Sequence, residues 1–376
     1  MWYLQQETLL ILAAFSVLSA LLRRFCPKKV FSMVLPLLSL AALFVISKRL
    51  CVFYMLYLCQ GAICAKIIRK WPKAPLFIFS SILAVIPFVV SRIDSFGFEL
   101  PFLFVSIGLA YAMLKIIDVY YYVYYTKLDV DLLVFANFIL FLPVFTAGPI
   151  FRYRDFIATH ENPLKMDGAL LTVCFKRIIW GLFEKIILVR CAMLVMERLL
   201  LVTPHWYISA GIIACSYLAL FFDLSGYSNI AIAFGKIAGY DVPENFKKPW
   251  EAASFTKFWR SWHATFSDWI REHIFIVVGR RKLSRPVSAL IALLTMVIMG
   301  LWHGFSLPFI IAGVYNGVLL AVENLLSLTT VNRNKTRKPV YVLRCFCVNF
   351  LFAINTIVFT LGGEQLLAVL GGMLRL

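Results

Sequence analysis

The sequence has few charged residues and no stretch long enough for a separate soluble domain. Charged side chains make up 15% of the 376 residues, whereas 62% are hydrophobic and the mean hydropathy is +0.86. One globular core cannot enclose so many apolar side chains. The longest mostly polar interval runs only from Gly239 to Arg285. These properties predict a single all-α, polytopic membrane domain over residues 1–376.

Acidic residues are scarce relative to basic ones. The chain has 19 Asp and Glu against 37 Lys and Arg, which gives a net charge of +18. In a soluble protein this excess of basic residues would suggest that the protein binds nucleic acid. Here, however, the basic residues lie in short clusters between apolar segments. Loop charge of this kind orients helices and contacts anionic lipid. We therefore expect the lipid bilayer, and no nucleic acid, as a partner.

Several motifs of common catalytic sites are missing. The nine cysteines lack the paired spacing of a zinc or disulfide framework and read as small buried apolar residues. No His-Glu-x-x-His occurs, so we expect no metal site. The segment "DLSGYS" (223–228) lacks the Gly-x-Ser-x-Gly elbow, which disfavours a serine nucleophile.

Apolar segments recur along the whole chain. Each is long enough, or nearly so, to cross a hydrocarbon layer of about 30 Å. They run approximately over 8–22, 30–46, 50–66, 75–91, 100–117, 130–148, 169–201, 206–222, 286–302, 305–327 and 341–361. We expect roughly 10–11 transmembrane helices. Arg23 and Arg24 follow the first segment instead of preceding it, so we interpret it as a retained span and not as a signal peptide.

Residues 255–278, "FTKFWRSWHATFSDWIREHIFIVV", are too polar to cross the bilayer but repeat apolar residues at helical spacing. The apolar side would consist of Phe255, Phe258, Trp259, Trp262, Phe266, Trp269, Ile270 and Ile274. The polar side would consist of Lys257, Arg260, Ser261, Ser267, Asp268, Arg271 and Glu272. This pattern predicts an amphipathic helix in or against the membrane interface. His263 and His273 fall on its apolar side, where each has either a structural or a functional role.

His303 ends an apolar segment in "MGLWHG" (299–304). Ionisable side chains at such positions are costly and usually face a cavity or a partner. Burial should keep the imidazole neutral near pH 7 and able to accept a proton. Gly300 and Gly304 would let another backbone or a substrate chain approach closely. A neutral imidazole aimed at a hydroxyl suits general-base catalysis of acyl transfer. His160 and His205 lie beside polar residues and are interpreted as incidental.

Four segments together resemble the membrane-bound O-acyltransferase family. They are "FTAGPIFRYRDF" (145–156), "FFDLSGYSNIAIAFGKIAGYDVPENFKKPW" (221–250), "FTKFWRSWHATFSDWIREHIF" (255–275) and "MGLWHG" (299–304). Their order and spacing are also similar to the family, and the resemblance covers about 130–320. Within the family, the sequences of these segments are most similar to the bacterial branch of alginate O-acetylation and teichoic acid D-alanylation membrane proteins.

The resemblance implies the fold of this family, with a central tunnel through the membrane. It implies that His303 is the catalytic base and that His263 is its companion near the tunnel. We expect the substrate to contact residues of the same segments and one later position, namely Trp302, Trp262, Trp259, Asn245, Arg260, Tyr227 and Asn316.

The resemblance also implies the reaction. An acyl group, acetyl in preference to D-alanyl, would pass from a cytoplasmic thioester to a hydroxyl of a cell-envelope polysaccharide. The donor would be an acyl-CoA such as acetyl-CoA or a phosphopantetheine carrier protein, with no bound cofactor. An extracytoplasmic acyltransferase or a small helper membrane protein would assist. The location would be the cell (cytoplasmic) membrane, with multiple passes.

Two other function classes stay open. Lys115 with Asp118, and the cluster of Lys176, Arg177, Glu184 and Lys185, could line the route of a transporter or flippase, although pairing inside a helix bundle is the simpler interpretation. A non-catalytic scaffold is the third alternative. It is kept open because the sequence departs from the family at Arg271-Glu272-His273, at Leu307 and at Asn316-Gly317.

Overall fold

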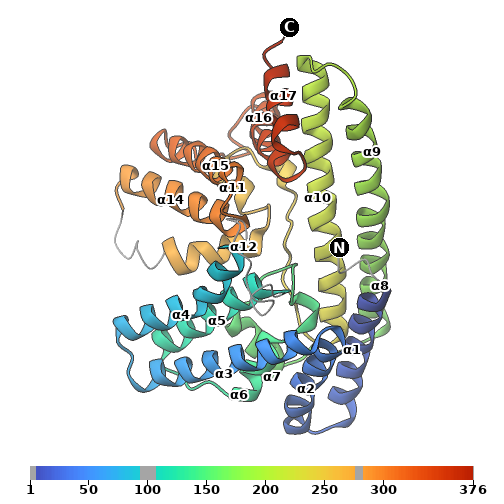
Figure 1. Ribbon diagram of the computed structural model, residues 1–376, viewed down its shortest axis with the longest axis vertical. Helices are drawn as coiled ribbons and strands as arrows, with labels where there is room; N and C mark the ends of the chain where they lie inside the picture. The colour runs from blue at the N-terminus through green and yellow to red at the C-terminus, as the bar shows by residue number, and fades with distance from the viewer. Residues whose placement is uncertain (1–5, 94–106, 276–282, 376) are drawn as a thin grey trace. The chain divides into compact units, whose positions relative to one another are not determined.

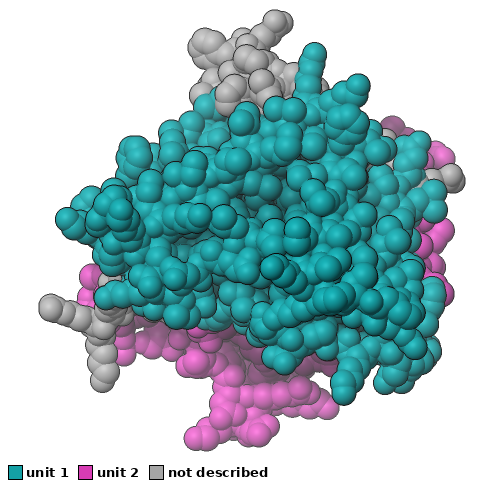
Figure 2. Space-filling view, turned by 90° about the horizontal axis from the view of Figure 1, so that it is seen from below, with its two compact units in different colours: residues 1–178, 230–243 teal, residues 179–229, 244–376 magenta. Residues whose placement is uncertain are grey.

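The computed structural model describes residues 6–93, 107–275 and 283–375, and these ranges contain helices and no strand (Figure 1). The described chain divides into two compact units, residues 1–178 with 230–243 and residues 179–229 with 244–376 (Figure 2). The unit boundaries fall within α8 (Gly168–Phe183) and α10 (Trp206–Ile237), so these two helices contribute to both units. The prediction of an all-α protein is confirmed.

The first unit is built from the N-terminal helices. It contains α1 (Gln6–Phe25), α2 (Lys28–Ile46), α3 (Lys48–Lys70), α4 (Ala74–Ile93), α5 (Leu109–Thr126), α6 (Leu132–Ile139), the 3-10 turn η4 (Leu142–Val144) and α7 (Tyr153–Glu161). His160 of α7 is buried, and its ring nitrogens lie 2.9 Å from Ser32 Oγ and 2.9 Å from Tyr240 Oη. Its role is therefore structural.

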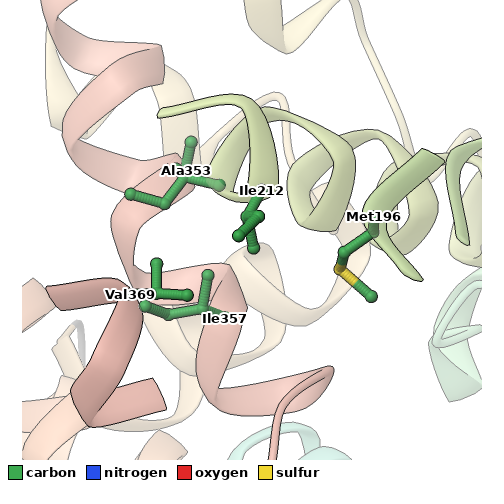
Figure 3. Close-up of a cluster of buried hydrophobic side chains, with 6 residues drawn as sticks. Met196, Ile212, Ala353, Ile357 and Val369 are labelled. Atoms are coloured by element: carbon green, nitrogen blue, oxygen red, sulfur yellow. The ribbon is translucent and has the colours of Figure 1, made fainter. Parts of the chain in front are cut away.

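The second unit holds the C-terminal half. It contains the π-helical turn η5 (Glu184–Leu188), α9 (Val189–Leu199), most of α10, η6 (Pro249–Glu251), α11 (Phe255–Trp259), α12 (Ala264–Ile270), the π-helical turn η7 (Arg271–Phe275), α14 (Arg285–His303), α15 (Leu307–Leu325), α16 (Lys338–Thr356), η8 (Ile357–Phe359) and α17 (Gly363–Gly372). An apolar cluster joins α9, α10, α16, η8 and α17 (Figure 3). It consists of Met196, Ile212, Ile213, Ala353, Ile357 and Val369.

Eight of the described helices are long and apolar enough to cross a membrane, which confirms a polytopic membrane protein. They cover residues 7–25, 28–46, 48–70, 74–92, 206–237, 285–303, 307–325 and 338–359. The predicted segment 100–117 lies partly outside the described residues. The predicted segment 169–201 is helical through α8, η5 and α9, but its charged side chains set it apart from those eight.

The expectation of one spanning helix over 130–148 is wrong. Helix α6 ends at Ile139, and Pro143 follows within η4, where it cannot donate a backbone hydrogen bond. Lys115 stabilises the break because its Nζ donates to the carbonyls of Phe138 (3.1 Å) and Ile139 (3.5 Å). These carbonyls at a helix C-terminus have no partner within the helix.

Four of the charged groups considered for a transport route, Lys115, Asp118, Glu184 and Lys185, have local partners. Asp118 pairs with Arg152 at 3.2 Å, not with Lys115, and it also accepts from the backbone N–H of Tyr153 at 2.6 Å. In the second unit, Lys185 pairs with Asp223 at 2.6 Å. These contacts support pairing inside the helix bundle over the transport interpretation.

The predicted continuous amphipathic helix over 255–278 is also wrong. The chain forms α11 and α12, separated by a turn in which His263 has a left-handed backbone with φ of +46°. Phe258, Trp262 and Phe266 of the predicted apolar side are buried within the protein, so this side does not face lipid. Residues 276–278 lie outside the described part of the chain.

Candidate functional site

The two histidines singled out by the sequence line one cavity of the second unit, although His303 lies 40 residues after His263. The cavity has a volume of about 230 Å³. Its walls come from α10, α11, α12, α14, α15, α16 and η8. The lining residues are Leu220, Leu224, Trp259, Trp262, His263, Phe266, Met296, Met299, Gly300, His303, Phe309, Ala312, Gly313, Asn316, Phe352, Asn355 and Phe359.

His263 occupies the N-cap of α12. Its carbonyl accepts hydrogen bonds from the N–H groups of Phe266 (3.0 Å) and Ser267 (3.1 Å), which begins the helix. The side chain is 9% exposed, and its buried Nδ1 has no hydrogen-bond partner in the described part of the chain. Burial lowers the pKa of His263 to about 4. The ring is therefore neutral at pH 7.

His303 is the last residue of α14 and sits among aromatic rings. Its ring centroid lies 4.9 Å from Trp302, 4.9 Å from Phe359 and 6.2 Å from Phe309. A row of ring contacts runs from one histidine to the other: Phe266 lies 5.3 Å from His263 and 4.8 Å from Trp302, which in turn contacts His303. The imidazoles thus share a surrounding of aromatic and apolar side chains.

Glycines bring α14 and α15 together beside His303. A Cβ added to Gly300 would collide with the carbonyl oxygen of Phe309, and one added to Gly304 would lie 2.6 Å from the Phe309 ring. A Cβ at Gly313 would lie 2.6 Å from the carbonyl oxygen of Met296. The expected close approach is confirmed, and the approaching backbone belongs to α15. Small residues allow such close crossings of membrane helices.

Some of the predicted substrate-binding residues line the cavity. Trp262, Trp259 and Asn316 do so, and the Trp302 ring contacts Phe266 of the cavity wall at a centroid distance of 4.8 Å. Asn316 donates from Nδ2 to the carbonyl of Ala312 at 2.9 Å, while its buried Oδ1 has no hydrogen-bond partner among the described residues. Trp262 is held by ring contacts.

The other predicted binding residues lie elsewhere. Asn245 is buried and forms hydrogen bonds with the turn that carries His263. It is not one of the described residues that line the cavity. Tyr227 is buried near Lys185, whose Nζ lies 5.8 Å from the Tyr227 ring centroid. Arg260 is exposed and lines a different cavity. His273 also lies outside the cavity, stacked on Trp269 at a centroid distance of 4.2 Å.

Several lining residues escaped the sequence analysis, and a polar one, Asn355, is among them. Asn355 of α16 and Phe359 of η8 lie in the apolar segment that was interpreted only as a membrane span. The available signal was the asparagine itself, since polar side chains inside such segments usually have a partner or a function. Among the described residues, no group of three or more His, Cys, Asp or Glu is placed to hold a metal ion.

A second cavity of about 260 Å³ adjoins the first, because Trp259, Met296 and Met299 line both. Its remaining lining residues are largely polar, and they are Thr256, Arg260, Ser267, Ile270, Arg271, Ala292, Thr295, Leu320, Asn324, Thr329 and Thr330. Arg260 and Arg271 are exposed, whereas Thr295 is 3% exposed. The cavity thus has a cationic, exposed side and a buried side against the histidine cavity.

Comparison with known proteins gives relatives in cell-envelope acylation. "Probable alginate O-acetylase AlgI" of Pseudomonas putida is 32% identical over 243 residues, 63% of this chain and 50% of the relative. "Teichoic acid D-alanyltransferase" of Streptococcus thermophilus is 31% identical over 219 residues, 54% of this chain and 53% of the relative. "Peptidoglycan O-acetyltransferase" of Helicobacter pylori is 29% identical over 200 residues, 52% of this chain and 38% of the relative.

The chain spans about half of the length of these curated relatives, or less. The sequence model of the membrane-bound O-acyltransferase family matches residues 123–361, which include every residue that lines the two cavities. Since this match covers more than half of the chain, the protein belongs to the membrane-bound O-acyltransferase family.

Proposed function

We propose that this protein is an O-acyltransferase that moves an acyl group from a thioester donor to a hydroxyl of a cell-envelope polysaccharide. The observation that supports it most is the shared cavity of His263 and His303, two imidazoles distant in sequence. The names of the relatives, which act on alginate, teichoic acid and peptidoglycan, support the class of acceptor.

In the proposed mechanism, His303 accepts the proton of the acceptor hydroxyl while the hydroxyl oxygen attacks the thioester carbonyl carbon. The resulting tetrahedral intermediate collapses, the carbon–sulfur bond breaks, and the proton passes from His303 to the leaving thiolate. The products are an ester and a free thiol. General-base catalysis of this kind contributes about 10²–10⁴-fold to a rate.

His263 would act as a neutral hydrogen-bond donor. Because its pKa is about 4, the ring carries one N–H at neutral pH, and this group can polarise the thioester carbonyl or orient the acceptor. The aromatic walls, including Trp262 and Phe266, would exclude water and so protect the thioester from hydrolysis.

We assign the second cavity to the donor. Arg260 on its exposed side suits the phosphate of a phosphopantetheine arm, whereas Arg271 already pairs with Asp268 at 3.0 Å. The buried end of this cavity adjoins the histidine cavity at Trp259. Coenzyme A and an acyl carrier protein both present such an arm. The two cavities together would form the tunnel that the family resemblance implies, with the donor entering from the cytoplasm.

We favour acetyl as the transferred group. The side chains that line the histidine cavity are apolar groups, neutral amides and imidazoles, which suit an uncharged acyl group. D-alanyl, with its amino group, is the second candidate because a teichoic acid D-alanyltransferase is among the relatives. In this proposal the protein works in the cell membrane with an extracytoplasmic acyltransferase or a small helper membrane protein that completes delivery.

Mass spectrometry of cell-envelope polymers tests the proposal. Polymers from cells that express the protein should carry an added acyl ester, with the mass of acetyl or of D-alanyl, that is absent from cells without it. The assay identifies the acyl group and the acceptor together. Identical polymers from both strains, under conditions in which the protein is produced, would contradict the proposed function.

A further inference from the structure

The turn that carries His263 is held by a neighbouring irregular segment, residues 244–248. The N–H of Ala264 donates to the carbonyl of Asn245 at 2.8 Å, and the N–H of Lys247 donates to the carbonyl of Ser261 at 2.8 Å. These two bonds lie on either side of His263. They fix the backbone of the turn, but they do not by themselves fix where it stands against the cavity wall.

The side chain of Asn245 supplies that connection. Its Oδ1 accepts from Thr265 Oγ1 at 2.8 Å and from the Thr265 N–H at 3.4 Å. Its Nδ2 donates to Ser228 Oγ at 3.1 Å, and Ser228 donates onward to the carbonyl of Leu224 at 2.9 Å. Leu224 lines the histidine cavity. The amide therefore ties the residues after His263 to the α10 wall of the same cavity.

This connection matters because His263 has an unfavourable backbone. A φ of +46° lies in the left-handed region, which a residue other than glycine adopts only where the surrounding structure imposes it. Asn245 is 3% exposed, and both ends of its amide are hydrogen-bonded within this arrangement. A buried amide with satisfied partners specifies one geometry.

We infer that Asn245 is a positioning residue that sets the location of the His263 ring in the cavity through Thr265 and Ser228, rather than a residue that binds substrate. This inference rests on the proposed function, since it assigns a role within the same reaction. Asn245 acts on the placement of a reacting group, so its loss should reduce the turnover of bound substrate more than substrate binding.

The test compares variants of the full chain in membranes from the cells that produce them, which retain any helper protein, with acetyl-CoA as donor and, as acceptor, polysaccharide from cells that lack the protein. Free thiol released and ester formed are both measured. Asn245→Ala and Thr265→Val should lower kcat by about 10–100-fold and leave the KM for acetyl-CoA within about twofold. Thr265→Ser keeps the hydroxyl and should retain kcat within about threefold of the unaltered protein.

Asn229→Ala is the matched control. Asn229 lies on the same helix, α10, and its Nδ2 donates to Glu184 Oε2 at 2.9 Å, so the variant loses a comparable amide without touching the His263 turn. Its kcat should equal that of the unaltered protein.

The outcomes separate the two ideas. An unaltered protein that forms no ester contradicts the proposed function. If the unaltered protein is active but Asn245→Ala has the same kcat as Asn229→Ala, the positioning role alone is overturned. If Asn245→Ala does not fold, the Thr265 pair decides, because equal kcat values for Thr265→Val and Thr265→Ser overturn the inference.

Discussion

Replacing Gly313 with alanine tests how closely α14 and α15 must pack to keep the histidine cavity in shape. The added Cβ would lie 2.6 Å from the carbonyl oxygen of Met296 and 3.1 Å from the Cα of Val297. Both are backbone atoms, so neither can rotate away. Since ordinary contact begins at 3.4 Å, the helices must separate by roughly 0.8 Å at this crossing.

That separation reaches the site directly. Gly300 and His303 on α14, and Asn316 on α15, line the same cavity, so moving one helix changes the spacing between them. Overpacking of this kind costs about 1–3 kcal/mol of stability. A displacement of about 1 Å among reacting groups can reduce a rate by about 10²-fold. We expect Gly313→Ala to lower both the melting temperature in detergent and the rate of acyl transfer.

Gly371→Ala is the control, because a Cβ at Gly371 of α17 would meet no atom within 4 Å. Melting of both variants and ester formation with acetyl-CoA are measured in parallel. If Gly313→Ala melts and transfers like Gly371→Ala, the close crossing has no influence on the cavity and the reasoning fails.

Three further predictions concern stability, pH and the donor. Asp118→Ala should cost about 3–5 kcal/mol because it removes a buried carboxylate that pairs with Arg152 and accepts from the N–H of Tyr153. Asp129→Ala at an exposed pair should cost at most about 1 kcal/mol in the same denaturation assay. Because burial lowers the pKa of His263 to about 4, the unfolded chain binds its proton first as the pH falls from 6.5 to 4, so stability should decrease over that window. In melting curves recorded against pH, His263→Gln should show a smaller decrease. Arg260→Glu should raise the KM for acetyl-CoA about tenfold with little change in kcat; an unchanged KM would remove this residue from the donor site.

Much of the architecture can be predicted from the sequence because membrane spans need long apolar segments. The same rule fails where a segment of spanning length contains its own interruption. Residues 130–148 look continuous in composition, but Pro143 removes a donor and Lys115, distant in the sequence, stabilises the helix end. The average composition of a segment cannot reveal that contact, because the contact is made by a residue outside the segment.

The centre of the site was predictable in part. His263 and His303 were identified from their position in apolar segments and from the family resemblance, and both line one cavity. Asn245 was assigned to substrate because it belongs to a recognised motif, whereas the structure places it behind the His263 turn. A motif indicates that a residue matters without indicating which of its neighbours it serves. The left-handed backbone of His263 could not be predicted, because such conformations are usually signalled by a glycine and this position is a histidine.

Ester formation by His303→Ala tests the central claim most directly. The purified protein, His303→Ala and His205→Ala are incubated with acetyl-CoA and cell-envelope polysaccharide, and folding is checked by melting temperature. His205 does not line the histidine cavity, so its variant serves as the control. We expect His303→Ala to remain folded and to lose at least about 10²-fold in ester formation, while His205→Ala stays active. Folded His303→Ala protein that forms ester at the rate of His205→Ala would contradict the account.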